Sequence, residues 1–287
     1  MERVVSAVVF ISLLVVIDSV IGEPFTLDCQ LPFENLKKHH PIDDNCAAQG
    51  EKDSHDPPDN VQPHELQNKT KNNFCAPTQN PALVTFVSFR KLQQKAYELP
   101  KAESWGKHHL PDDRAILRNI YTTSENVTIG EGSVVTFAAW LMKVRPGSVE
   151  SCNCGSTNGS DPEMTDLHLV LIESSPTSNC SSSINHTLEC KSVTAEVSPH
   201  FRPEQWNKET ICSAALGHPL RFTGQLMYDA SHRAPCSRRG SKDPYRRSGW
   251  EIHPVYATDV CDNTSLSKCK ADNDSVWKPL DQWQGNH

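Results

Sequence analysis

The feature that most narrows the folds open to this chain is a change of hydrophobic period near Asn126. After that residue, apolar and polar side chains alternate in short segments that Gly, Pro, Ser and Asn clusters separate. Such alternation is typical of β-strands with one face in a core. The segments are Ser133–Arg145, Asp166–Ile172, Ser192–Ser198, Leu220–Asp229 and Glu251–Val260.

Five strands within one stretch of chain predict a mainly β fold. We expect a small, five-stranded, partly closed barrel like the oligonucleotide/oligosaccharide-binding (OB) barrel, with an antiparallel β-sandwich as the alternative. A strand count does not separate the two folds, because both bury one face of each strand. A short helix is expected near Glu204–Thr210, between the third and fourth strands.

The chain before Asn126 has a different pattern. Residues 23–125 form a polar, cysteine-bearing extension, in which apolar spacing predicts short helices at Ser88–Leu99 and Asp113–Ile120. Ser88 is the expected cap of the first helix and Pro100 its stop. The predicted domains are a leader at 1–22, the extension at 23–125, the barrel at 126–262 and a polar tail at 263–287.

The first 22 residues predict export. A nearly unbroken apolar run from Val4 to Ile17 follows a short polar start, and small residues precede Glu23. A helix that crosses a bilayer needs about 20 apolar residues, so this run is typical of a cleaved signal peptide, with a retained anchor as the alternative. No later apolar run has spanning length. We therefore expect a secreted, extracellular protein with no membrane insertion.

Cysteines and sequons agree with export. All 11 cysteines follow the predicted leader, and disulfides are their expected state in an oxidising compartment. The odd count leaves one thiol free or available for an intermolecular disulfide. Asn-x-Ser/Thr sequons predict glycosylation, and therefore surface positions, at Asn68, Asn126, Asn158, Asn179, Asn185, Asn263 and Asn273.

Histidines and carboxylates recur at strand spacing. Asp166 and His168 share one face of the second predicted strand, and Glu251 and His253 share one face of the last. His200 and His232 lie at two further strand ends. If these strand ends meet at one rim, the six residues predict a site for a divalent metal such as zinc, manganese or iron. The alternative is a row of solvated or structurally hydrogen-bonded side chains, which half-exposed sheets commonly carry.

Basic residues concentrate between the fourth and fifth strands. Arg238, Arg239, Arg246 and Arg247 lie in this connection, which contributes to ligand binding in OB barrels. Such a loop predicts binding of polyanions, for example a polyanionic glycan. A solvated loop is the alternative, because charge runs commonly have no binding role. The formal net charge of -7 argues against a general nucleic-acid-binding protein.

Distinctive blocks of sequence resemble a family of uncharacterised secreted proteins from bacteria and eukaryotes. The blocks begin at Lys71, Asp166, Ser198, Asp229 and Trp250 and read KNNFCA, DLH, SPHFRP, DASH and WEIHPVY. The resemblance implies one domain that includes the same histidines, and it lends no catalytic residues. Motifs of common serine hydrolases, P-loop proteins, zincins and dinucleotide-binding enzymes do not occur in the sequence.

Three functions remain open from the sequence. The first is a secreted, disulfide-containing glycoprotein that binds partners in the extracellular matrix. The second is a metal-dependent hydrolase with the His/carboxylate site, with zinc or manganese as the expected cofactor. The third is a polyanion-binding module centred on the arginine loop.

Overall fold

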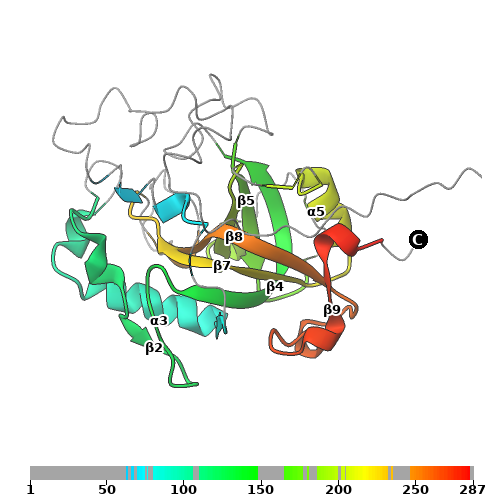
Figure 1. Ribbon diagram of the computed structural model, residues 1–287, viewed down its shortest axis with the longest axis horizontal. Helices are drawn as coiled ribbons and strands as arrows, with labels where there is room; N and C mark the ends of the chain where they lie inside the picture. The colour runs from blue at the N-terminus through cyan, green and yellow to red at the C-terminus, as the bar shows by residue number, and fades with distance from the viewer. Residues whose placement is uncertain are drawn as a thin grey trace, which may run out of the picture.

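The computed structural model describes one barrel with short additions before and after it (Figure 1). The residues that it describes are 63, 66–67, 70–74, 76, 80–105, 110–147, 165–176, 180, 186–199, 202–203, 205–231, 234 and 246–284. The predicted leader lies outside these residues. Within them, no helix is both long and apolar enough to cross a membrane.

Five strands close into a mixed barrel. They are β4 (Val134–Pro146), β5 (Leu167–Ile172), β6 (Val193–Val197), β7 (Leu220–Tyr228) and β8 (Trp250–Cys261). Their order around the barrel is β4-β5-β6-β8-β7, and a β4–β7 pairing closes the ring. The predicted small five-stranded barrel is therefore confirmed over the sandwich, while the OB relationship itself stays a prediction.

Strand β4 can serve both closing contacts because it is long. Its first half, from Val134 to Ala139, pairs with β7, and its second half, from Trp140 to Pro146, pairs with β5. All barrel pairings are antiparallel except β6–β8, which is parallel. A parallel neighbour needs a long connection, and β7 together with the helix α5 (Lys208–Ala214) lies in the chain between β6 and β8.

Further strands and short helices extend the barrel. Strand β1 (Ala82–Leu83) adds to β4 in parallel, and β9 (Trp277–Pro279) adds to β8 in antiparallel orientation. Strands β2 (Tyr121–Thr122) and β3 (Thr128–Ile129) form a separate hairpin. The remaining described elements are α4 (His186–Glu189) and the 3-10 helices η3 (Ala102–Ser104), η4 (Arg114–Leu117), η6 (Leu266–Lys268), η7 (Asp274–Val276) and η8 (Leu280–Gln282).

The helix α3 (Phe86–Tyr97) begins two residues before the predicted start. Thr85 caps it by accepting a hydrogen bond from the Ser88 amide, and the Ser88 hydroxyl accepts one from the Thr85 amide. Ser88 is thus the third helical residue of a capping box, not the cap itself. The predicted helix at Asp113–Ile120 is the shorter η4, which Asp113 caps through the Ala115 amide.

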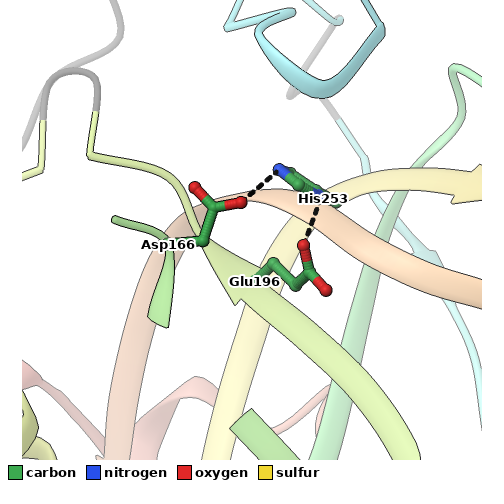
Figure 2. A group of neighbouring side chains, drawn as sticks. All are labelled: Asp166, Glu196 and His253. Atoms are coloured by element: carbon green, nitrogen blue, oxygen red, sulfur yellow. Dashed lines mark ion pairs between the residues drawn. The ribbon is translucent and has the colours of Figure 1, made fainter. Parts of the chain in front are cut away.

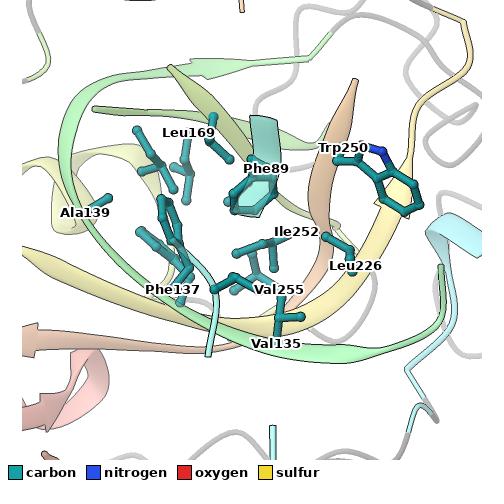
Figure 3. Close-up of a cluster of buried hydrophobic side chains, with 14 of the residues drawn as sticks. Phe89, Val135, Phe137, Ala139, Leu169, Leu226, Trp250, Ile252 and Val255 are labelled. Carbon is teal, nitrogen blue, oxygen red and sulfur yellow. The ribbon is translucent and has the colours of Figure 1, made fainter. Parts of the chain in front are cut away.

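The core fills the inside of the barrel. Phe137 of β4 contacts Phe86 and Phe89 of α3 edge-on, with ring centroids 4.9 and 5.1 Å apart. Phe89 lies among inward-pointing side chains such as Leu169 and Ile252 (Figure 3). The helix α3 therefore belongs to the same core as the barrel, although it lies in the predicted extension.

Both ends of the described chain fold onto the barrel. Helices α3 and α5 lie on opposite sides of it in Figure 1. The segment predicted as a polar tail instead contributes β9 and the buried Leu280 to the fold. It is held by the disulfide Cys261–Cys269, and a second disulfide, Cys180–Cys212, joins the chain after β5 to α5. Cys190 is also disulfide-bonded. The protein is thus disulfide-containing, as predicted.

Candidate metal site

Polar side chains of three neighbouring strands meet on the outer surface of the barrel. Leu167 and Leu169 point into the core from β5, so Asp166 and His168 project from the other face. The same alternation sends Glu196 outward from β6, and both Glu251 and His253 outward from β8. Strand alternation alone therefore selects these five polar residues for one face.

The strand register brings these residues side by side. His168 of β5 is the Cα partner of Glu196 in β6. In the parallel β6–β8 pair, Thr194 aligns with Glu251, and continuing this register by two residues places Glu196 beside His253. Although the residues are on the outer face, Asp166, Glu251 and His253 are fully buried, and Glu196 is 2% exposed.

His253 is the centre of the cluster. Its Nδ1 lies 2.8 Å from Glu196 Oε2 and 3.8 Å from Glu251 Oε2, and its Nε2 lies 3.9 Å from Asp166 Oδ2. Figure 2 shows Asp166 and Glu196 facing different nitrogens of the ring. Asp166, Glu196 and His253 each offer a ligand atom within 4.8 Å of the others. This donor set of two carboxylates and one imidazole suits zinc, manganese or iron.

Glu196 also contacts the second histidine of the cluster. Its Oε1 lies 3.1 Å from His168 Nδ1. Gly147 packs against the other side of His168, where an added Cβ would come within 2.8 Å of Nε2. A side chain at position 147 would thus push His168 from its place, so glycine keeps the ring directed at Glu196.

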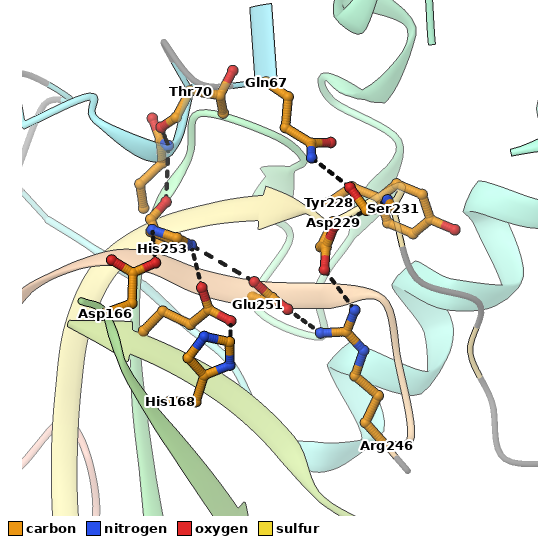
Figure 4. A network of polar contacts seen from close by, with 12 residues as sticks. Gln67, Thr70, Asp166, His168, Tyr228, Asp229, Ser231, Arg246, Glu251 and His253 are labelled. Atoms are coloured by element: carbon orange, nitrogen blue, oxygen red, sulfur yellow. Dashed lines mark hydrogen bonds and ion pairs between the residues drawn. The ribbon is translucent and has the colours of Figure 1, made fainter. Parts of the chain in front are cut away.

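A buried arginine, Arg246, contacts two further carboxylates at the cluster, those of Asp229 and Glu251. Arg246 Nη2 donates to Asp229 Oδ2 at 2.7 Å, and Nη1 donates to Glu251 Oε1 (Figure 4). Arg246 is 3% exposed. Its two partners stand on either side of the β7–β8 connection, so the pairings join the start and the end of that loop.

Burial and charge shift the pKa values within the cluster. Burial by itself lowers the pKa of His253, but the nearby Glu196, Glu251 and Asp166 carboxylates outweigh it and raise the pKa to about 10. Burial, reinforced by Glu196, raises the pKa of Glu251 to about 7 despite the opposing charge of Arg246. For Arg246, burial opposes the charged form, yet Glu251 and Asp229 raise its pKa further above the usual value.

The segment before β1 covers the cluster. Gln225 of β7 donates through Nε2 to the backbone oxygens of Thr70, at 2.8 Å, and His253, at 3.0 Å. Its Oε1 accepts from Asn73 Nδ2, and Tyr256 donates to the Asn73 carbonyl. Residues from the KNNFCA block therefore pack against the strand that carries His253.

The structure brings together four of the six sequence-predicted metal residues, namely Asp166, His168, Glu251 and His253. The remaining two, His200 and His232, lie outside the described residues. The sequence reading missed Glu196, which contacts both histidines. Its signal was present, because Thr194 and Glu196 alternate with Val193, Ala195 and Val197 in the third strand.

The arginine loop is described only at its end. Arg246 belongs to the buried cluster, and Arg247 donates to the Lys191 carbonyl at 3.0 Å while its guanidinium lies over the Phe86 ring. Arg238 and Arg239 lie outside the described residues.

Among the predicted glycosylation sites that are described, Asn126 and Asn273 are exposed and Asn263 is half-buried. Asn68, Asn158, Asn179 and Asn185 lie outside the described residues.

Comparisons with protein-family models, with curated proteins and with solved structures find no match to this chain. The function must therefore be argued from the site itself.

Proposed function

We propose that this protein is a secreted glycoprotein that binds one divalent transition-metal ion on the outer face of its barrel. The observation that carries the proposal is His253, whose Nε2 is buried, makes no hydrogen bond to any described residue and faces Asp166 across 3.9 Å. A buried imidazole nitrogen aimed at a carboxylate across such a gap is a ready pair of ligands for an ion. Glu196, on the Nδ1 side of the ring, is a second carboxylate within 4.8 Å of these atoms.

The burial of the donors favours a stable metal over a freely exchanging one. Asp166 and His253 have no exposed surface, so an ion between them would be shielded from water. Oxygen and nitrogen donors without a thiolate favour zinc, manganese or iron over copper(I). The disulfides and the sequons match the extracellular setting that the leader predicts.

Titration of the metal-free, full-length mature protein with Zn²⁺ and Mn²⁺ tests the binding. We expect one ion per chain in the wild type, loss of this binding in Asp166→Asn, and unchanged binding in Asp274→Asn. Asp274 is the matched control because its exposed side chain pairs with Arg221, outside the cluster. Absence of binding in the wild type, or binding that Asp166→Asn leaves intact, contradicts the proposal.

Glycosylation has its own test. The exposed Asn126 and Asn273 are expected to carry glycans in protein secreted from eukaryotic cells. Glycosidase treatment should lower the apparent mass, and Asn126→Gln and Asn273→Gln should each remove one glycan. Secreted protein whose mass does not change with the glycosidase would contradict this part.

A further inference from the structure

The carboxylates around His253 decide which of its nitrogens can face a metal ion. Two carboxylate oxygens approach Nδ1, at 2.8 and 3.8 Å, whereas one approaches Nε2, at 3.9 Å. A neutral imidazole carries a proton on one nitrogen and a lone pair on the other. The proton is most stable beside the nearer and more numerous negative oxygens. When an ion displaces one proton from this ring, Nδ1 therefore keeps its proton and Nε2, beside Asp166, is the nitrogen that binds the ion.

The distances lead to the same assignment. Two ligands of one tetrahedral zinc ion lie about 3.3–3.6 Å apart, and two on opposite sides of an ion about 4.0–4.3 Å apart. The gap of 3.9 Å between His253 Nε2 and Asp166 Oδ2 lies between these two ranges, so a small shift of the side chains lets both atoms bind one ion. The 2.8 Å between Nδ1 and Glu196 Oε2 is shorter than the separation of two tetrahedral zinc ligands, so this contact is an ion pair and not a pair of zinc ligands.

Each carboxylate on the Nδ1 side is itself held through its other oxygen. His168 lies 3.1 Å from Glu196 Oε1, and Arg246 donates to Glu251 Oε1. Neighbours on β5 and at the end of the β7–β8 loop thus fix both acceptors. Fixed acceptors orient the imidazole before an ion arrives, as carboxylates that hold metal-bound histidines commonly do.

We propose that Glu196 is a positioning residue: it holds the Nδ1 proton of His253 so that Nε2 binds the ion beside Asp166, and His168 steadies Glu196. This inference rests on the proposed metal site and assigns unequal roles within it. Asp166 and His253 contact the ion, whereas Glu196 acts through His253. Removing the charge of Glu196 should therefore weaken the site without changing the ligands of the metal.

Titration with Co²⁺ separates a positioning residue from a ligand, because the visible spectrum of cobalt reports its ligand set. In Glu196→Gln the amide oxygen can still accept the Nδ1 proton. We expect it to keep one ion per chain and the wild-type spectrum, with affinity lowered about 10- to 100-fold. Asp166→Asn should lose the spectrum. Glu189→Gln is the matched control, since Glu189 pairs with His186 at 3.6 Å, away from the cluster.

A measurement on the unsubstituted protein gives a second test that does not depend on the folding of a variant. In zinc-loaded protein with ¹⁵N-labelled histidine, the ring whose signals move on zinc addition should show a protonated Nδ1 and a zinc-bound Nε2. Zinc on Nδ1, or a Glu196→Gln variant that loses the ion as Asp166→Asn does, overturns the positioning role alone. A wild type that binds no metal overturns the proposed function as well.

Discussion

Two buried polar clusters lie on this barrel, and their hydrogen bonding differs. In the first, one edge of the Arg114 guanidinium donates to Glu131, with Nε at 2.7 Å and Nη2 at 2.5 Å. Arg114 also donates to the Tyr228 carbonyl and to Gln67, and the Tyr228 amide donates back to Glu131. This cluster is a forked ion pair with hydrogen bonds to its surroundings, which is the arrangement that a buried charge pair needs for stability.

The second cluster, around His253, lacks this fit. His253 stands among three carboxylates, yet its Nε2 makes no hydrogen bond to a described residue and faces Asp166 across 3.9 Å. The protein thus pairs both charges of the first cluster, whereas in the second it leaves one buried imidazole nitrogen facing a gap. The comparison teaches that burial and charge do not by themselves mark a functional site. What indicates the site is a buried potential metal ligand that has no hydrogen-bond partner among the described residues and faces a gap.

Breaking the first cluster should have the largest effect on stability and none on metal binding. Arg114→Leu leaves Glu131 buried without its guanidinium, which should lower the free energy of unfolding by about 3–5 kcal/mol. Urea denaturation measures this loss, and zinc titration of the folded variant should still give one ion per chain. Arg118→Leu, at an exposed position nearby, is the control. An Arg114→Leu variant as stable as this control would remove the contrast between the clusters.

The second cluster should make the metal-free protein less stable as the pH rises. Glu251 titrates near 4.5 when unfolded and at about 7 when folded, so the native state binds more protons between these values. For His253 the pKa rises from 6.5 to about 10 on folding, so the native state also binds more protons than the unfolded state between these two pH values. Both groups therefore reduce the free energy of unfolding with increasing pH, by on the order of a few kcal/mol across the window.

Denaturation of metal-free protein at pH 5, 7 and 9 measures this slope, with His253→Gln to isolate the contribution of the histidine. We expect the wild type to lose more stability than the variant between pH 7 and pH 9. Bound zinc should flatten the slope, because the ion takes the place of a proton. The account is contradicted if the free energy of unfolding of the wild type rises relative to that of His253→Gln as the pH increases.

Metal binding should stabilise the protein only through the second cluster. An ion that binds the native state alone raises the free energy of unfolding by about 2.7 kcal/mol at a free concentration of 100 times Kd. Thermal or urea denaturation with and without zinc measures the gain. It should vanish in Asp166→Asn and persist in Arg114→Leu. An equal gain in both variants would place the ion elsewhere.

An exposed ion pair should have the smallest effect on the free energy of unfolding. It is the reference against which the effects of the two buried clusters are compared. Lys95 and Glu98 of the α3 region lie 2.6 Å apart at the surface, with side chains 48% and 61% exposed. Lys95→Ala should change the free energy of unfolding by no more than about 0.5 kcal/mol, because water screens the pair. A cost comparable to that of Arg114→Leu would show that burial does not separate these interactions.

The strands could be predicted from the sequence because their alternation is local. The segments Ser192–Ser198 and Glu251–Val260 differ from β6 and β8 by only one residue at each end. The same alternation placed Asp166, His168, Glu251 and His253 on polar faces before their contacts were known. Helix starts were harder, because Thr85 and Ser88 can both serve as caps and only the fold selects Thr85.

The composition of the site could not be predicted, because it depends on register and on contacts distant in sequence. Glu196 lies between His168 and His253 only in the register that β6 adopts with β5 and β8. Arg246, which the sequence assigns to a polyanion-binding loop, is drawn inward by Asp229, a residue 17 positions away. Periodicity says which face a side chain takes, but it does not say which neighbour meets it there.

The most direct test is the metal content of the mature protein purified without chelator from cells that secrete it, measured by elemental mass spectrometry beside Asp166→Asn. The account predicts about one zinc, manganese or iron ion per chain in the wild type and a near-complete loss in the variant. Less than about 0.2 ions per chain in a wild type that also fails to take up added metal would contradict it.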